Sequence, residues 1–298
     1  MKDKNIYLFG MVLASTSFLL KEFPKVDEYS EIKNIYRLPG GETGTCATVL
    51  SSLGINVKLD GNHIGRNISP LLNSFYKDKT VDLSSLNFDD NYDGLEDYII
   101  ISDKYRSPMG TFGNYFTNGE KRWNSPKEED IINCSVAAID PFFQEQSEQA
   151  ARFCVKHGKP YVTIDCSFNS YVHQNAAISI ISGEGIHLYY PDMSREELFP
   201  LFIEKSDGLT IITNGGNDLF YGRKGTKMKR FSPYKVDVVS TLGAGDSFKA
   251  GCSYALLNGM DDDNIIKFAS ACSAVAITKF PLPLNPPKIN EIMDIINK

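Results

Sequence analysis

Short apolar runs alternate with longer helical patterns along most of the chain. Runs such as IYLFG, INVKLDG and YVTID are typical of strands, whereas TCATVLSSLG, QSEQAARFCVKHG and SREELFPLFIEK have helical spacing. This alternation indicates βαβ units around a mostly parallel sheet with helices on both faces. There is no repeat at a fixed period and no linker rich in Pro, Gly or Ser, so residues 1–298 are predicted to form one α/β domain.

One interval departs from that alternation. Residues 98–123 (YIIISDKYRSPMGTFGNYFTNGEKRW) alternate apolar and polar side chains and are predicted to turn at Asn118 and Gly119. This pattern predicts antiparallel strands that form a small flap on the edge of the main sheet.

The composition excludes several classes of protein. The 298 residues are 42% hydrophobic with a formal net charge of -6, which argues against a nucleic-acid surface because such surfaces need clustered Lys and Arg. The basic run at 223–230 (RKGTKMKR) is therefore interpreted as a solvated turn between strands.

The cysteines and the amino terminus bear on the compartment. Six cysteines lack any CxxC pair, which favours buried reduced thiols in a cytoplasmic protein over disulfides or zinc. Residues 1–20 loosely imitate a secretory signal, but Asp3 lies in the charged part and no clear cleavage site follows. The apolar run of 15 residues is too short to span a bilayer, so no membrane association is expected.

The strongest local signal is the stretch KVDVVSTLGAGDSFKAG. Residues 236–239 are predicted to form a strand and residues 243–245 a tight loop, before a helix with Phe248, Cys252 and Leu256 on one face. A glycine loop that leads into a helix amino terminus is typical of an anion site, because unpaired N–H groups and the helix dipole face the loop.

Asp246 follows that loop directly, and two interpretations of it stay open on spacing alone. It could cap the helix and stabilise it by about 1 kcal/mol. It could also act as a general base that takes the proton of a hydroxyl attacking a phosphoryl group held by the loop. The chain contains neither GxxxxGK[ST] nor a GxGxxG after the first strand, so P-loop and dinucleotide-binding interpretations lose support.

These residues resemble the ribokinase-like (PfkB) carbohydrate and nucleoside kinases. The late DTxGAGD signature of that family stands here as 240–246, STLGAGD. Gly40 and Gly41 resemble the early GG motif, TNGG at 213–216 resembles the TxG nucleotide turn, and SREEL at 194–198 resembles the NxxE helix start. The matches fall in the family's order over nearly the whole chain.

The resemblance implies a ribokinase-like three-layer α/β sandwich, with a central mostly parallel sheet and a small β-lid from segments near 12–38 and 98–123. It implies transfer of the γ-phosphoryl group of ATP, with Mg²⁺, to a hydroxyl of a sugar or sugar derivative. Alternatives are a nucleoside kinase of the same family and a catalytically inactive ligand-binding homologue. Related kinases often dimerise through the lid, so a homodimer is a further expectation.

The resemblance also assigns roles to residues. Asp246 becomes the catalytic base. The resemblance assigns the anion hole to Gly243, Ala244 and Gly245. It assigns the nucleotide contacts to Thr213, Gly215, Gly216 and Thr241, and the contact with the magnesium water shell to Glu197. Ser194 and Glu197 also form an SxxE capping box, which is an equally good explanation of that pair.

Several positions depart from the family's pattern. Ser240 replaces the first Asp of DTxGAGD, which makes activation by a monovalent cation such as potassium doubtful. On the substrate side, Leu13 and Ser15 stand where the family often has Asn and Asp, and Thr45 replaces an Asn. The candidate substrate contacts are therefore Ser15, Gly40, Gly41, Thr45 and, for an anionic group, Arg122; Tyr115 or Phe116 could pack on a ring.

Overall fold

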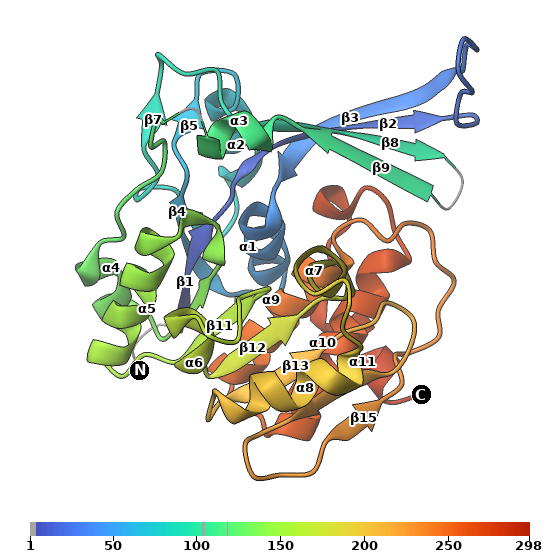
Figure 1. The fold of residues 1–298 in the computed structure, drawn as a ribbon. Coiled ribbons are helices and arrows are strands. Elements are labelled where there is room, and N and C mark those ends of the chain that lie inside the picture. The colour runs from blue at the N-terminus through green and yellow to red at the C-terminus, as the bar shows by residue number, and fades with distance from the viewer. Residues whose placement is uncertain (1–3, 103–104, 118) are drawn as a thin grey trace.

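A nine-stranded sheet forms the centre of the molecule. The computed structural model describes residues 4–102, 105–117 and 119–298. The strand order is β15-β14-β13-β12-β11-β10-β1-β4-β6, and all neighbours from β13 to β6 pair in parallel. The two strands at the other edge, β14 and β15, pair antiparallel (Figure 1).

The main sheet and the helices alternate along the chain. The main sheet consists of β1 (Asn5–Gly10), β4 (Asn56–Gly61), β6 (Val81–Asp82), β10 (Val136–Ile139), β11 (Tyr161–Ile164), β12 (Ile178–Ile181), β13 (Leu209–Ile212), β14 (Leu219–Gly222) and β15 (Lys229–Phe231). The helices are α1 (Glu42–Ser52), α2 (Ser69–Tyr76), α3 (Phe112–Thr117), α4 (Glu128–Asn133), η1 (Pro141–Phe143), α5 (Glu145–Lys156), α6 (Tyr171–Gln174), α7 (Gly183–Tyr189), α8 (Arg195–Glu204), α9 (Ala244–Leu257), α10 (Asp262–Ile277), η2 (Leu282–Leu284) and α11 (Ile289–Ile296).

The strands send alternate side chains to two separate cores. In β1, Ile6 and Leu8 pack with the core that contains α1, α9 and α10, whereas Tyr7 and Phe9 pack with the core that contains α5. A third cluster under α8 covers the same sheet further along. Because both faces of the sheet are covered, the strands read as continuous apolar runs, and the predicted three-layer α/β class is confirmed.

A second, four-stranded sheet projects from one end of the molecule (Figure 1). It has the order β3-β2-β8-β9 and consists of β2 (Leu13–Leu20), β3 (Ile32–Gly40), β8 (Glu96–Ser102) and β9 (Tyr105–Gly110). We call these four strands the lid. A small pair, β5 (Ile64–Gly65) and β7 (Phe88–Asp89), lies outside both sheets.

The segment 98–123 differs from its prediction. The antiparallel pair is β8 with β9, so the strands end at Gly110, and residues 112–117 form the helix α3 instead of continuing as a strand. Asn118, where the turn was predicted, lies outside the described residues. The alternating apolar residues at 112–117 were therefore wrongly assigned to a strand. Tyr115 in this segment packs in the core cluster of the protein body and not on the lid.

The strand predicted at residues 236–239 is wrong. This segment has no strand partner, and Val238 and Val239 are about half exposed. The backbone N–H groups of Val239 and Ser240 instead donate to the carbonyl oxygen of Ile277, at the end of α10. The segment therefore runs beside α10, outside the sheet, and leads into the glycine loop that precedes α9.

The predictions for the cysteines and for the basic run agree with the structure. All six cysteines are buried and unpaired. The basic run at 223–230 spans the turn between β14 and β15. Within the residues that the structure describes, no helix is long and apolar enough to cross a membrane.

The contact between α9 and α10 depends on a residue without a side chain. A Cβ atom at Gly251 would lie 2.7 Å from Cα of Ala269, a backbone atom that cannot move aside cheaply. Alanine would raise helix propensity by about 1 kcal/mol, but overpacking of this kind costs about 1–3 kcal/mol. We therefore expect Gly251→Ala to lower the free energy of unfolding by about 1 kcal/mol, measured by chemical denaturation.

The matched control is Gly113→Ala in α3, where an added Cβ meets nothing within 4 Å. That variant should be neutral or slightly more stable. Equal destabilisation of both variants would mean that the helix contact is not the cause.

Candidate active site

The glycine loop caps α9 without a side chain. Gly243 is the N-cap and adopts a left-handed conformation with φ 79°, which only glycine occupies without strain. A Cβ there would lie 2.9 Å from Cδ1 of Leu282 and 3.3 Å from Cγ2 of Thr45. The loop is therefore held between α1 and η2, and Thr45, a predicted substrate contact, lies directly against it.

The first turn of α9 leaves backbone N–H groups free. Ala244 donates to the carbonyl of Thr241 at 3.2 Å, and Ser247 donates to that of Gly243 at 2.9 Å. In the described part of the chain, the N–H groups of Gly245 and Asp246 have no such acceptor. A Cβ at Gly245 would meet open space, so the position is accessible to an anion such as a phosphate oxygen. The anion hole of Gly243, Ala244 and Gly245 stays a prediction; the N–H of Ala244 is already bonded, and the N–H of Asp246 is a further free donor beside the loop.

Asp246 is the third residue of α9, and no side chain forms a capping bond at this helix end. Burial and the negative charge of Glu42 raise the pKa of Asp246 to about 8, while the ammonium of Lys249 lowers it. The capping interpretation of Asp246 therefore has no support in its geometry. Its role as the catalytic base stays a prediction.

The substrate side gathers residues from the lid and α1. Ser15 on β2 stands opposite Asp97 on β8, and the nearby Ser15 hydroxyl lowers the pKa of the Asp97 carboxyl against the larger effect of burial. A side chain at residue 40 would clash with Ser15, because a Cβ at Gly40 would lie 1.9 Å from Oγ of Ser15. Gly41 is the N-cap of α1 with φ 78°, where a Cβ would lie 2.5 Å from the carbonyl oxygen of Met11. These predicted contacts therefore meet at one place, the junction of lid and body.

Two carboxylates at that junction escaped the sequence analysis. Glu42 is the first residue of α1, and burial and the charge of Asp140 raise its pKa to about 7. Burial raises the pKa of Asp97 to about 6, and its buried Oδ1 has no hydrogen-bond partner among the described residues. Glu42 follows the GG pair immediately, which was the one available signal.

Arg122 is placed in a different network. Its guanidinium forms ion pairs with Glu120 at 2.6 Å and with Asp89 at 3.1 Å, and it stacks on the ring of Tyr92. The carbonyl oxygen of the same residue accepts a hydrogen bond from Oη of Tyr115 at 2.6 Å. Two carboxylates already neutralise this arginine, so its geometry does not favour the predicted contact with an anionic substrate group.

The predicted nucleotide residues lie at the end of β13. Thr213 follows the strand and its N–H donates to Ile181 at 2.9 Å, while Cβ atoms at Gly215 and Gly216 would meet open space. Asn214 lines a cavity of about 260 Å³ together with Ser194 and residues of α7. An open, glycine-lined turn beside a cavity fits the approach of a nucleotide to the backbone.

Glu197 forms the capping box of α8. Its Oε2 accepts hydrogen bonds from the backbone N–H of Ser194 at 2.8 Å and from the Ser194 hydroxyl at 2.7 Å. The capping interpretation is confirmed, and the contact with the magnesium water shell stays a prediction. Oε1 of Glu197 is not part of the box.

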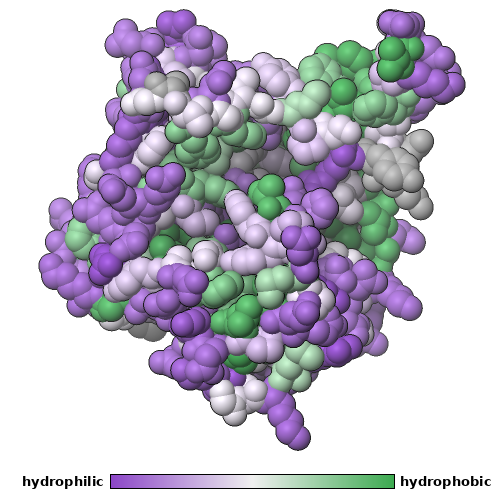
Figure 2. All heavy atoms as spheres, in the orientation of Figure 1, coloured by the Kyte–Doolittle hydropathy of each residue, from purple (hydrophilic) through white to green (hydrophobic). Residues whose placement is uncertain are grey.

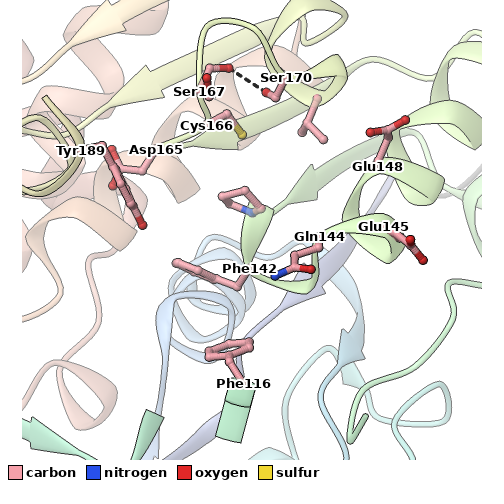
Figure 3. Close-up of a pocket in the computed structure, with 12 residues that line it drawn as sticks. Phe116, Phe142, Gln144, Glu145, Glu148, Asp165, Cys166, Ser167, Ser170 and Tyr189 are labelled. Carbon is pink, nitrogen blue, oxygen red and sulfur yellow. Dashed lines mark hydrogen bonds between the residues drawn. The ribbon is translucent and has the colours of Figure 1, made fainter. Parts of the chain in front are cut away.

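A larger cavity opens at the carboxyl ends of β10 and β11. Its volume is about 640 Å³. Figure 3 shows the rings of Phe116 and Phe142 on one side, Asp165 and Tyr189 on another, and Glu145 at the start of α5. Burial and the charge of Asp165 raise the pKa of Tyr189. Phe116 was one of two predicted ring contacts; the other, Tyr115, is buried.

Comparison with known proteins agrees with this geometry. Residues 194–285 match the profile of pfkB family carbohydrate kinases. The 5-dehydro-2-deoxygluconokinase of Bacillus licheniformis is 29% identical over 103 residues, which are 35% of this chain and 31% of that protein. This match therefore spans about a third of the relative's length. The kinase of the same name from Clostridium perfringens is 23% identical over 301 aligned positions, with 90% and 87% coverage.

Solved structures resemble the whole chain. A crystal structure of a putative ribokinase from Agrobacterium tumefaciens has a TM-score of 0.88 at 17% identity and covers 99% of this chain and 98% of its own. Arabidopsis thaliana ribokinase, solved with ribose and ATP, has a TM-score of 0.82 at 16% identity with 99% of both chains covered. A putative ribokinase II from E. coli, solved with ATP and Mg²⁺, gives 0.79 at 16% identity, again with 99% of both chains covered. The fold is therefore ribokinase-like, and residues 194–285 are the part of the chain that matches the pfkB family carbohydrate kinases.

Proposed function

We propose that the protein is an ATP-dependent kinase that phosphorylates a hydroxyl of a sugar or sugar derivative. The observation that carries the proposal is the position of the Asp246 carboxylate. It forms no helix-capping hydrogen bond, and it follows a glycine loop whose free N–H groups are open to an anion. A base beside an anion site is the arrangement that phosphoryl transfer to a hydroxyl requires.

In this mechanism Asp246 accepts the proton of the substrate hydroxyl as its oxygen attacks the γ-phosphorus. The bond from the γ-phosphorus to the bridging oxygen breaks, and ADP leaves. The N–H groups of Gly243, Gly245 and Asp246 stabilise the charge on the transferring phosphoryl oxygens. When bound with ATP, Mg²⁺ neutralises phosphate charge that the Asp246 and Glu42 carboxylates would otherwise repel, and Glu197 is the residue proposed to order its water shell.

The substrate is proposed to lie between the lid and the large cavity. Ser15, Thr45, Glu42 and Asp97 offer hydroxyl and carboxylate partners in place of the amide and carboxylate groups that the family's pattern supplies. Carboxylates are strong acceptors for sugar hydroxyls. The cavity of about 640 Å³ has more room than one sugar ring needs, which favours a substituted sugar.

The organisation of the chain completes the proposal. We propose that residues 1–298 act as one catalytic domain, with the lid covering the substrate. The unpaired buried cysteines are consistent with a reducing, cytoplasmic location, which stays a prediction.

We also propose a homodimer through the outer face of the lid. Strand register puts Ile35, Phe18 and Ile100 in one row and Tyr98 and Met109 in the next row on that face. Ile35, Tyr98 and Met109 are 59%, 41% and 49% exposed, and Figure 2 shows apolar side chains gathered on this part of the surface. Arg37, Thr16 and Ser107 share these two rows, so polar residues are mixed with the exposed apolar side chains on this face. Exposed apolar side chains gathered on one face are typical of an interface, and a second copy of the chain is its proposed occupant.

The first prediction concerns the base. Asp246→Asn removes the proton acceptor but keeps the size of the side chain, so kcat should fall by about 10²–10⁴-fold while the melting temperature stays the same or rises. ADP release across a panel of sugars and nucleosides measures it. Asp237→Asn, on the exposed segment before the loop, should keep wild-type activity.

The same panel separates the alternatives. Turnover of nucleosides alone would make the protein a nucleoside kinase. Saturable binding of a sugar without ADP release, in folded protein with Mg²⁺, would identify an inactive homologue and contradict the proposal.

The second prediction concerns pH. Because the pKa of Asp246 is raised to about 8 and the base acts in its ionised form, kcat/KM should decrease as the pH falls through that value. Glu42→Gln removes a negative charge that raises this pKa, so the acid limb should move to lower pH. A profile of kcat/KM from pH 5.5 to 9 tests both, and an unmoved limb would show that Glu42 does not act on the base.

The third prediction concerns assembly. Ile35→Glu places a charge in the proposed interface, so sedimentation velocity should show a dimer for the wild type and a monomer for the variant. Val155→Glu is the matched control, since Val155 is 45% exposed on α5, outside the lid. A monomeric wild-type protein at micromolar concentration would refute the dimer.

A further inference from the structure

A lysine is completely buried one turn after Asp246. Lys249 is 1% exposed on α9, on the side of the helix that faces the sheet. Its Nζ donates to Oδ1 of Asp140 at 2.5 Å, and Asp140 is itself 0% exposed. Although burial lowers the pKa of Lys249, the charge of Asp140 and other neighbours raises it above its ordinary value, so the ammonium stays protonated. A buried ion pair is costly to form and needs complete hydrogen bonding.

The surroundings of Asp140 supply that bonding. Oγ1 of Thr43 donates to Oδ2 of Asp140 at 2.5 Å, so both carboxylate oxygens have a partner. The backbone N–H of Asp140 donates to Phe9 at 2.9 Å, and the Asp140 carbonyl accepts from Oγ of Ser147 at 2.6 Å. Room for the carboxylate comes from Gly10, where a Cβ would lie 2.2 Å from both Asp140 Oδ2 and Thr43 Oγ1.

The pair joins the two sides of the site. Lys249 stands on the helix that carries Asp246, Thr43 stands on α1 directly after the GG pair and Glu42, and Asp140 directly follows the carboxyl end of β10. A shift of α9 relative to α1 would leave charged groups buried without partners, which is strongly unfavourable. The pair therefore fixes the distance between the base and the substrate side.

We propose that Lys249 is a positioning residue for Asp246: held by Asp140 and Thr43, its buried ammonium orients the base and keeps its carboxylate ionisable. The proposal rests on the kinase function proposed above. It assigns to Lys249 an electrostatic effect on the base that a packing role alone would not have.

The charges around Asp246 support this role. Glu42 faces it from α1, Lys249 from α9, Asp140 from the end of β10 and Arg106 from β9 of the lid. The thiol of Cys46 on α1 is also near, but burial raises its pKa and it stays neutral. Among these groups Lys249 has the larger favourable effect on the ionised carboxylate, and Arg106 the smaller. Without Lys249, Glu42 and burial would act on Asp246 almost unopposed.

The test uses the double variant Lys249→Met/Asp140→Asn. It removes both charges together, and the asparagine amide keeps an acceptor for Thr43, so the fold should survive. Lys249→Met alone leaves Asp140 buried without its cation and should melt at a clearly lower temperature than the double variant. Lys249→Arg keeps the positive charge, so the Asp246 carboxyl group should titrate with a midpoint pH near that of the wild type.

Two readouts report on Asp246. The ¹³C titration of its carboxyl group, assigned by the disappearance of the signal in Asp246→Asn, does not need activity. In the double variant the midpoint should move to higher pH by about half a unit or more, with kcat/KM at pH 7 reduced about threefold or more and largely restored at high pH. Ile292→Ala, a core variant in α11, controls for reduced stability. It should lower the melting temperature without moving the midpoint of the Asp246 titration or of the pH profile of kcat/KM.

The outcomes are distinct. An unmoved Asp246 titration in the double variant, or an equal shift in Ile292→Ala, would overturn the positioning role. A shifted titration in a protein that phosphorylates nothing would support the role of Lys249 on Asp246 and refute the kinase function instead. A shift in Lys249→Arg as large as in the double variant would also overturn the proposal, because that variant keeps the charge.

Discussion

The placement of charge at the carboxyl edge of the parallel sheet is the constraint on which the site depends. Asp140, Asp246 and Glu42 converge there from three separate elements, and Lys249 is the buried cation among them. Three carboxylates with one ammonium leave a net negative charge, so two of the acids are held with raised pKa values. This arrangement is unfavourable for folding alone, which is why such clusters are typical of functional sites.

The raised pKa of Asp246 also has a chemical consequence. A carboxylate with its pKa raised to about 8 is a stronger base than an ordinary aspartate, which suits the role of proton acceptor that we propose for it. Binding of a cation or of phosphate-bound Mg²⁺ nearby would lower that pKa again. In the proposed mechanism, Asp246 therefore has a lower proton affinity in the substrate complex than in the free protein, so binding would be coupled to proton release near neutral pH.

The sequence was informative where a signal is local. The glycine loop, Asp246 and the capping box at Ser194 each lie within a few consecutive residues, so spacing alone could predict them. Lys249 and Asp140 are 109 residues apart, and nothing in the sequence indicates that a lysine in a helix of small residues has a buried partner. The strand predicted at 236–239 failed for a related reason, because the carbonyl of Ile277, not a neighbouring strand, accepts its N–H groups.

The junction of lid and body contains a close contact between two positions that carry small residues. Ser15 and Asp97 stand opposite each other on β2 and β8, and Gly40 leaves the space that Ser15 occupies. A larger side chain at residue 40 would displace Ser15, because a Cβ there would lie 1.9 Å from Oγ of Ser15. Residues 15 and 40 are therefore interdependent, since any side chain at residue 40 requires Ser15 to move.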